Sequence, residues 1–353
     1  MKKMLRIILL CCSLWYAACA LLSTPALASD KELLGAGATF PFPFYQKLFD
    51  TYFQTTGIKV NYQAIGSGGG IQQLKQKTVD FGGTDAFMTD KEISEAGAPI
   101  VHIPTCLGAV VITYNVPGNP QLRITPEVIA DIFLGKITKW NDKRILDANP
   151  GVVLPDMNID TIHRSDGSGT TAIFSDYLCK VSAEWKERVG EGKSLNWPCG
   201  LGAKGNPGVA GLIKQVPGSL GYVELLYALG NNMPCALVKN KSGVFVKPSI
   251  ESVSLAADVT MPDDTRVSIT NTAAPNGYPI SGFTWLVVYK EQQYEGRTKP
   301  RVESLVKLLW WVIHEGQQFA AALDYAPLPQ GAVAKAEALV KSITYAGQPV
   351  LQQ

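Results

Sequence analysis

The sequence predicts an α/β fold divided into two lobes. Short apolar strands alternate with amphipathic helices along the chain, a pattern typical of layered α/β proteins. The roughly 325 residues that follow an N-terminal leader exceed what one hydrophobic core usually covers. In addition, three strand-to-helix junctions are rich in glycine and hydroxyl residues, which predicts a ligand site where they meet.

Residues 1–28 have the pattern of a secretory signal peptide. Two lysines and an arginine lie among the first six residues, an apolar stretch follows, and Ala26-Leu27-Ala28 precedes Ser29. An alternative interpretation makes Tyr16-Ala17-Ala18-Cys19 a lipid-attachment box, but tyrosine stands where leucine is usual. We therefore expect cleavage before Ser29 and a periplasmic location.

Charge and hydropathy exclude two classes of partner. Removing the three basic residues of the leader leaves 29 basic against 30 acidic residues, so bulk charge should attract neither nucleic acid nor an anionic membrane. No later segment reaches the roughly 18 unbroken apolar residues of a membrane span, because Lys307 interrupts even LVKLLWWVI. We expect a soluble, exported monomer.

Four cysteines follow the leader: Cys106, Cys179, Cys199 and Cys235. An even number in an oxidising compartment favours disulfides, and four cysteines allow three connectivities. We favour Cys179–Cys199, which closes a short loop, and then Cys106–Cys235; buried free thiols are the alternative. No Cys/His spacing suits a metal, so neither a metal nor a cofactor is expected.

The first junction lies in LLGAGATFPFPFYQKLFDTYF. Apolar residues recur every four positions from Phe44, and Pro41 and Pro43 suit a first helical turn, so a helix should start near Thr39 and Phe40.

Two further junctions have the same composition. In one, the alternating strand IKVNYQA meets Gly66-Ser67-Gly68-Gly69-Gly70 and then a helix that carries Ile71 and Leu74. In the other, a strand through Ile162 meets RSDGSGTT, residues 164–171, and then another amphipathic helix.

Such junctions favour anions for a physical reason. The first turn of a helix leaves backbone N–H groups unpaired, its dipole favours negative charge, and glycine allows a ligand close to the backbone. Each junction alone is more often a simple helix cap. Three of them with a single arginine, Arg164, predict a cradle of neutral donors around one full charge.

Motifs for catalysis are missing. The chain has neither GxxxxGK[ST] nor GxGxxG nor GxSxG, and GLGAKGNPG at 200–208 only partly resembles the first. His163 alternates with Arg164 along a strand and should point to the opposite face. The cradle is therefore expected to hold a ligand without reacting with it.

Asp85 is the candidate that selects the anion. It follows the strand-like VDF segment and two glycines at the edge where open α/β sheets bind ligands. An ionised carboxylate only accepts hydrogen bonds, so it should accept one from a phosphate P–OH and reject sulfate. A site built around such a bond can reject the analogue that lacks it by ~10⁴–10⁵. Thr89, in contrast, begins a capping box with Glu92.

Six segments together resemble the PstS family, the phosphate-binding proteins of the high-affinity phosphate ABC transporter. They run in order across nearly the whole chain after the leader: GAGATFP (35–41), GSGGG (66–70), VDFGGTDA (79–86), LGKITKWND (134–142), RSDGSGTT (164–171) and GYVE (221–224). The resemblance implies a type II periplasmic binding fold, in which two lobes, each a mixed sheet flanked by helices, close over one phosphate and deliver it to a membrane permease.

The resemblance also implies the contacts. It assigns phosphate contacts to the following residues: Thr39, the Phe40 amide, Ser67, Asp85, Arg164, Ser168, the Gly169 amide and Thr170. Asp166 is expected to steady the Arg164 guanidinium from behind. GSGGG has more glycine than the GSSGG more usual in relatives, and His163 stands where a second basic residue can occur.

The order of the segments predicts how the chain links the lobes. Residues 29–105 and 278–353 should form lobe I, and residues 106–277 should form lobe II. Apolar segments near 101–118 and 276–290 should be the hinge strands, with RVESLVKLLWWVIHEG packing back on lobe I. The alternatives are a secreted phosphatase on the same fold, a carrier of sulfate or molybdate, and an adhesive or sensory protein.

Overall fold

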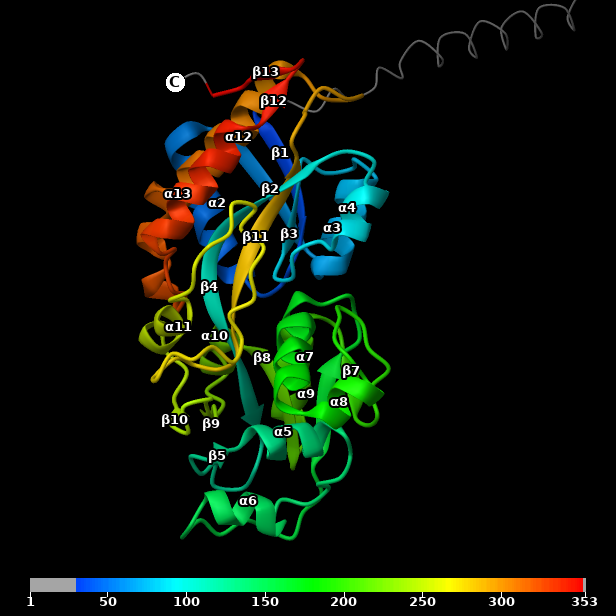
Figure 1. The fold of residues 1–353 in the computed structure, drawn as a ribbon, viewed down its shortest axis with the longest axis vertical. Helices are drawn as coiled ribbons and strands as arrows, with labels where there is room; N and C mark the ends of the chain where they lie inside the picture. Colours follow the sequence, from blue (N-terminus) through cyan, green and yellow to red (C-terminus); the bar gives the residue numbers. More distant parts are fainter. Residues whose placement is uncertain (1–29, 352–353) are drawn as a thin grey trace, which may run out of the picture.

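The computed structural model describes residues 30–351, and the expected leader and cleavage site lie outside them. Two lobes lie one above the other, joined along a single sheet (Figure 1). The eight strands of this sheet have the order β2-β1-β3-β11-β4-β8-β6-β7. Among the described residues, no helix is long and apolar enough to cross a membrane.

Lobe I contains the N-terminal strands and both ends of the described chain (Figure 1). Its parallel strands are β1 (Glu32–Gly37), β2 (Lys59–Ala64) and β3 (Phe81–Thr84), and β11 (Ser281–Tyr289) pairs antiparallel with β3. Its helices are α2 (Phe42–Thr56), α3 (Ser67–Lys75), α4 (Asp90–Glu95), α12 (Lys299–Ile313) and α13 (Gln330–Lys341). Short 3-10 turns (Glu315–Phe319, Ala321–Leu323) and a hairpin of β12 (Thr344–Tyr345) and β13 (Gln348–Pro349) complete it.

Lobe II contains the middle of the chain. Its sheet strands are β6 (Asp160–Arg164), β7 (Leu201–Ala203) and β8 (Ser219–Glu224). Its helices are α5 (Pro126–Phe133), α6 (Lys143–Ala148), α7 (Gly169–Val181), α8 (Ala183–Arg188), α9 (Gly205–Gln215) and α10 (Leu225–Leu229). A small sheet of β5 (Arg123–Ile124), β9 (Leu237–Lys239) and β10 (Phe245–Val246) lies nearby, and α11 (Ile250–Ala256) precedes the return to lobe I.

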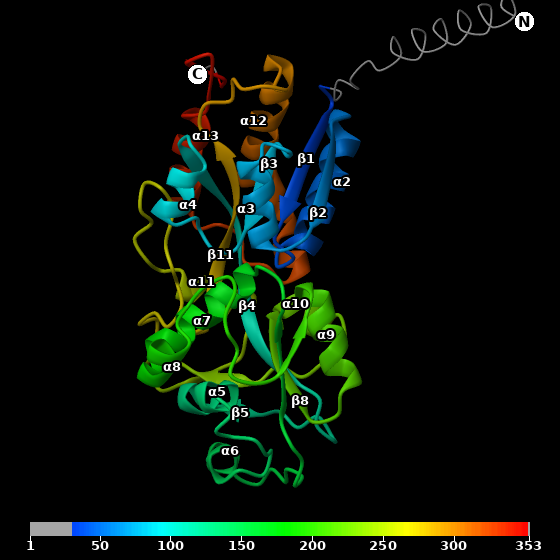
Figure 2. The ribbon, with the colours of Figure 1, turned by 90° about the vertical axis from the view of Figure 1, so that its right-hand side faces the viewer.

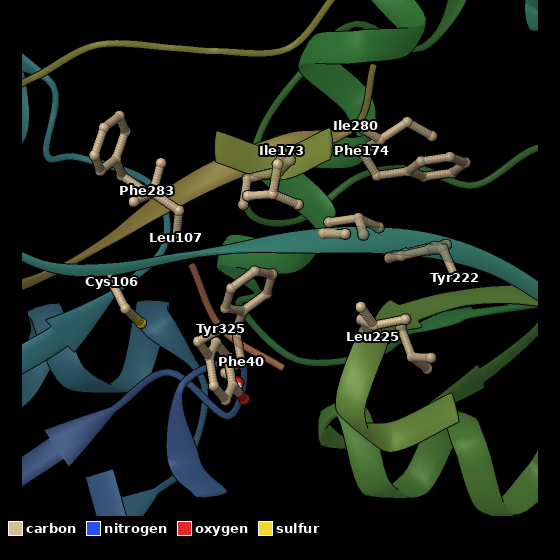
Figure 3. Close-up of a cluster of buried hydrophobic side chains, with 14 of the residues drawn as sticks. Phe40, Cys106, Leu107, Ile173, Phe174, Tyr222, Leu225, Ile280, Phe283 and Tyr325 are labelled. Carbon is tan, nitrogen blue, oxygen red and sulfur yellow. Dashed lines mark hydrogen bonds between the residues drawn. The ribbon is translucent and has the colours of Figure 1, made fainter. Parts of the chain in front are cut away.

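The two lobes share strand β4 (Ile100–Tyr114), all fifteen residues of which are buried. Up to Ala109 this strand pairs with β11, and from Val110 it pairs with β8. Apolar side chains from both lobes pack along this crossing, including Phe40 and Tyr325 on one side of it and Tyr222 further along (Figure 3). The expected apolar segments near 101–118 and 276–290 therefore contain β4 and β11.

Local rules account for the helix starts. Thr89 Oγ1 accepts the Glu92 amide and the Glu92 carboxylate accepts the Thr89 amide, which confirms the predicted capping box. Helix α2 starts at Phe42, with a proline in its first turn and Pro41 before it, within three residues of the predicted start.

Strand β3 includes Gly82 and Gly83, whereas the sequence predicted that the strand ends before them. Both positions need glycine because α3 and Tyr62 pack directly against them and leave no room for a Cβ.

The predicted disulfides are wrong, because all four cysteines in the described part of the chain are free. Cys235 bridges to Thr113 of β4, seven positions along that strand from Cys106. At about 3.3 Å per residue these positions are more than 20 Å apart, beyond any disulfide. Cys199 Sγ lies 3.5 Å from the Phe133 carbonyl and 3.4 Å from the Thr161 hydroxyl, in contact with the end of α5 rather than with Cys179.

Candidate functional site

The three glycine-rich junctions meet between the lobes. The start of α3 belongs to lobe I and the start of α7 to lobe II, and the two views of the fold place these helices on facing sides of the boundary (Figures 1 and 2). The Gly68 amide donates to the Gly167 carbonyl at 2.8 Å, so the second and third junctions are in direct contact. Close approach is possible because both residues are glycines: a Cβ on either would lie 3.1 Å from the other's Cα.

Every residue for which a phosphate contact was expected is buried in this region. Thr39, Asp85 and Arg164 are each less than 5% exposed, as are the side chains of Phe40, Ser67, Ser168 and Thr170. Asp166 is slightly more open, with 12% of its side chain exposed. A buried cluster of one arginine, two aspartates and four hydroxyls suits a small polar ligand better than a large one.

The guanidinium of Arg164 is held from one side. Its Nε and Nη2 donate to the two carboxylate oxygens of Asp166 at 2.7 and 2.6 Å, and the Gly205 amide donates to the same carboxylate at 3.0 Å. Burial alone would raise the pKa of Asp166, but the hydrogen bonds and the charge of Arg164 outweigh it and lower that pKa. Asp166 therefore fixes the fork of Arg164 through Nε and Nη2, and Nη1 on the other side makes one long bond, to Thr170 Oγ1 at 3.4 Å.

His163 lies apart from this pair. Its ring stacks on Trp197, with 4.7 Å between ring centroids and an interplanar angle of 11°. The adjacent side chains of β6 therefore make separate contacts, as strand alternation predicted.

Asp85 follows β3 and faces lobe II. Its Oδ1 accepts the Thr284 hydroxyl at 2.8 Å, and its Oδ2 lies 3.4 Å from Ser67 Oγ. A Cβ on Gly169 would lie 2.6 Å from Asp85 Oδ2 and 2.5 Å from Ser67 Oγ, so only glycine fits between these groups. The carboxylate therefore faces the first turn of α7.

The charge of Asp85 differs from expectation. Burial raises the pKa of Asp85 to about 7, and hydrogen bonding by Thr284 and the charge of Arg164 oppose this rise. This raised pKa contradicts the prediction that the carboxyl is fully ionised at neutral pH.

The hydroxyls of Ser67 and Ser168 are positioned by backbone amides that donate to them. Ser67 Oγ accepts the amides of Asp85 and Gly169, at 3.2 and 3.1 Å. Ser168 Oγ accepts the Thr171 amide at 3.0 Å and so caps α7. The Ser67 hydroxyl also donates to Asp85 Oδ2 at 3.4 Å, whereas the Ser168 hydroxyl keeps a hydrogen that it can donate to a ligand.

Phe40 contributes by packing as well as by its backbone. Its ring lies under Gly108 of β4, where a Cβ would approach it to 2.6 Å, and its carbonyl accepts the Tyr325 hydroxyl at 2.7 Å. The first junction is thereby fixed to the shared strand.

Three residues of this region escaped the sequence analysis: Asn206, Tyr227 and Thr284. Asn206 contacts Thr39 and Thr170, Tyr227 donates to the Thr39 carbonyl at 2.6 Å, and Thr284 contacts Asp85. One signal was present for Asn206, because GLGAKGNPG is a fourth glycine-rich strand-to-helix junction, between β7 and α9.

Comparisons with known proteins show which family the chain matches. Residues 23–313 match the family model of the PBP superfamily domain. The phosphate-binding protein PstS of Xylella fastidiosa is 44% identical over 326 residues, which cover 90% of this chain and 87% of that protein. The PstS of Pasteurella multocida is 42% identical over 329 residues, covering 91% and 94% respectively.

Solved structures share the fold. A high-affinity periplasmic phosphate-binding protein, PfluDING, bound with phosphate, has a TM-score of 0.68 at 21% identity and covers 87% of this chain and 93% of its own. A putative phosphate ABC transporter substrate-binding protein with bound phosphate from Clostridium perfringens has a TM-score of 0.62 at 18% identity, covering 84% and 100%.

Proposed function

The chain belongs to the PstS family of phosphate-binding proteins within the PBP superfamily, and on that premise we propose that it binds inorganic phosphate between its lobes and delivers it to the permease of a phosphate ABC transporter. One observation carries the proposal: a single guanidinium, paired with the Asp166 carboxylate, and a second carboxyl, that of Asp85, are buried together among neutral donors from the three junctions. That set matches an anion which bears both bare oxygens and a P–OH.

Each predicted contact has a role in this proposal. Arg164 binds two phosphate oxygens with the Nη1 and Nη2 hydrogens that Asp166 does not accept, while Asp166 holds the guanidinium from the other side. The hydroxyls and amides of the three junctions donate to the remaining oxygens: Thr39, Phe40, Ser67, Ser168, Gly169 and Thr170. To do so, the Gly169 amide exchanges Ser67 Oγ, and the Ser67 hydroxyl exchanges Asp85 Oδ2, for a phosphate oxygen. Asp85 accepts the hydrogen of the P–OH group. The protein acts as a monomer in the periplasm and holds its ligand without reacting with it.

We also propose that the lobes divide close to 105/106 and 277/278. The change of partner on β4 between Ala109 and Val110 and the start of β11 at Ser281 support crossings within a few residues of these positions. Because both crossings are strands of one sheet, a change of sheet twist would be the movement that opens the cleft.

Calorimetry on residues 29–353 tests the function. Phosphate should bind, and sulfate in excess should compete poorly at pH 8. Arg164→Ala and Ser67→Ala should each weaken phosphate binding at least ~100-fold, since each removes a buried partner of the anion. Arg144→Ala and Ser254→Ala, which alter exposed residues far from the cleft, are matched controls.

The outcome separates this proposal from its alternatives. Unchanged phosphate affinity in Arg164→Ala would contradict the assignment of the guanidinium. Equal affinity for sulfate and phosphate at pH 8 would favour a general oxyanion carrier. Turnover of a chromogenic phosphate ester, lost in Arg164→Ala, would favour a phosphatase.

A further inference from the structure

Asn206 lies at the centre of the hydrogen bonds between the lobes. It is the second residue of α9 in lobe II, and it is fully buried. Its backbone N–H and its side-chain Nδ2 donate to Thr39 Oγ1 of lobe I at 3.1 and 3.0 Å. The same Nδ2 donates to Thr170 Oγ1 at 3.0 Å. One amide group thus serves two of the hydroxyls proposed to bind phosphate.

The orientation of this amide is fixed by its other end. Asn206 Oδ1 accepts the backbone N–H of Glu224 at 2.9 Å. A backbone N–H can only donate, so the oxygen must face Glu224 and the NH₂ group must face the threonines.

The bonds from Asn206 limit which hydrogen bonds the Thr39 and Thr170 hydroxyls can still make. A hydroxyl oxygen accepts at most two hydrogen bonds and donates one. Thr39 Oγ1 accepts both from Asn206, and Thr170 Oγ1 accepts one from Asn206 and a longer one from Arg164 Nη1 at 3.4 Å. Their accepting positions are filled, so the only bond that either can still make is a donated one.

We propose that Asn206 is a positioning residue that sets Thr39 and Thr170 as obligate donors toward the anion. The inference rests on the proposed function and deepens it. Where Asp85 requires a hydrogen from the ligand, these two hydroxyls require a bare oxygen. Because Asn206 and Thr39 belong to different lobes, the bonds between them form only as the lobes meet, whereas the bond from Asn206 to Thr170 lies within lobe II. Selection at Thr39 therefore operates in the closed protein and not in the first encounter.

A double-mutant cycle tests the proposal. Phosphate affinity is measured by calorimetry at pH 8 for the native protein, Asn206→Ala, the pair Thr39→Val/Thr170→Val, and the triple variant. Asn206→Ala alone should weaken binding on the order of 10- to 100-fold, because both hydroxyls can then turn and accept. In the background without the hydroxyls, the same change should cost less than about threefold.

The control is Asn115→Ala. The Asn115 amide donates to the carbonyls of Ile213 and Lys214, at the opposite end of α9 from Asn206. It should change phosphate affinity less than about threefold even if it lowers the unfolding temperature. If Asn206→Ala does not fold, Asn206→Ser takes its place in the cycle.

Each result is decisive. An Asn206 effect of the same size in both backgrounds, or no effect at all, would overturn the positioning role while leaving phosphate binding intact. A native protein that does not bind phosphate would instead overturn the proposed function. If Asn115→Ala weakens phosphate binding as much as Asn206→Ala does, the loss of affinity comes from disturbed packing of α9, and the proposal fails.

Discussion

The hydroxyl oxygen of Ser67 accepts the backbone N–H of Gly169 at 3.1 Å, although the two residues belong to different lobes. The bond joins the first turns of α3 and α7, and Asp85 lies against both of its ends. A small steric change at this point should therefore act on closure rather than on folding.

Gly169→Ala should abolish phosphate binding in a protein that still folds. The added Cβ would lie 2.5 Å from Ser67 Oγ and 2.6 Å from Asp85 Oδ2, far inside contact distance, so the lobes could not meet. Calorimetry should detect no phosphate binding, and small-angle scattering should detect no compaction by phosphate. Gly211→Ala, in α9 where a Cβ meets nothing within 4 Å, is the matched control and should bind normally. Native affinity in Gly169→Ala would contradict the closed contact.

Asp85→Asn should reduce the preference for phosphate over sulfate. The amide can donate to a fully deprotonated oxyanion, whereas the carboxylate can only repel it. Competition calorimetry at pH 8 should show the ratio of phosphate to sulfate affinity falling at least ~100-fold. Asp160→Asn, at an exposed position of β6, controls for loss of a negative charge. An unchanged ratio would remove Asp85 from the selection of the anion.

In the native protein, the preference for phosphate over sulfate should also depend on pH. The pKa of Asp85 is about 7, so the group is ionised at pH 8 and protonated well below pH 7. A protonated carboxyl can donate to sulfate. Sulfate affinity should therefore rise as the pH falls from 8 to 5.5, and this rise should be absent in Asp85→Asn. A sulfate affinity that is flat over this range would contradict the raised pKa.

The stability of the fold should fall as the pH rises through the titration of Asp85. Burial raises the pKa of Asp85 from 3.8 in the unfolded chain to about 7, so the folded state binds more protons between these values. Asp85 therefore destabilises the fold as pH rises through this window, by up to about 4 kcal/mol above pH 7. Asp85→Asn should raise the unfolding temperature at pH 8 much more than at pH 4.5. Equal shifts at both pH values would exclude this linkage.

The free cysteines give a chemical prediction. Alkylation of the unfolded, unreduced chain of residues 29–353 should modify all four thiols, as measured by intact mass. A reducing agent should leave the unfolding temperature unchanged. A mass that shows only two modified thiols would mean that one disulfide forms.

Local chemistry explains what the sequence could predict. The junctions around Thr39, Ser67 and Ser168 follow from rules that act within a few residues, as does the capping box at Thr89. The prediction that these junctions lie close together rested on two further arguments: ligands bind at one edge of an α/β sheet, and the chain resembles a known family.

Long-range contacts explain what it could not. Thr284 reaches Asp85 across 199 positions and Asn206 reaches Thr39 across 167, and no local pattern marks such pairs. The state of Asp85 was misjudged because its pKa depends mainly on burial, which is a tertiary property. The cysteine pairing failed for a related reason: loop length does not reveal which strand positions face each other.

The β12–β13 hairpin lies at the end of lobe I that points away from lobe II (Figure 1), and Asp30 accepts a hydrogen bond from Thr298, the residue that caps the start of α12. A surface, a bead or a fluorescent protein joined at either place would leave the mouth between the lobes unobstructed. A phosphate biosensor can therefore be attached through this end of lobe I, and a dye on lobe II would report each closure of the lobes.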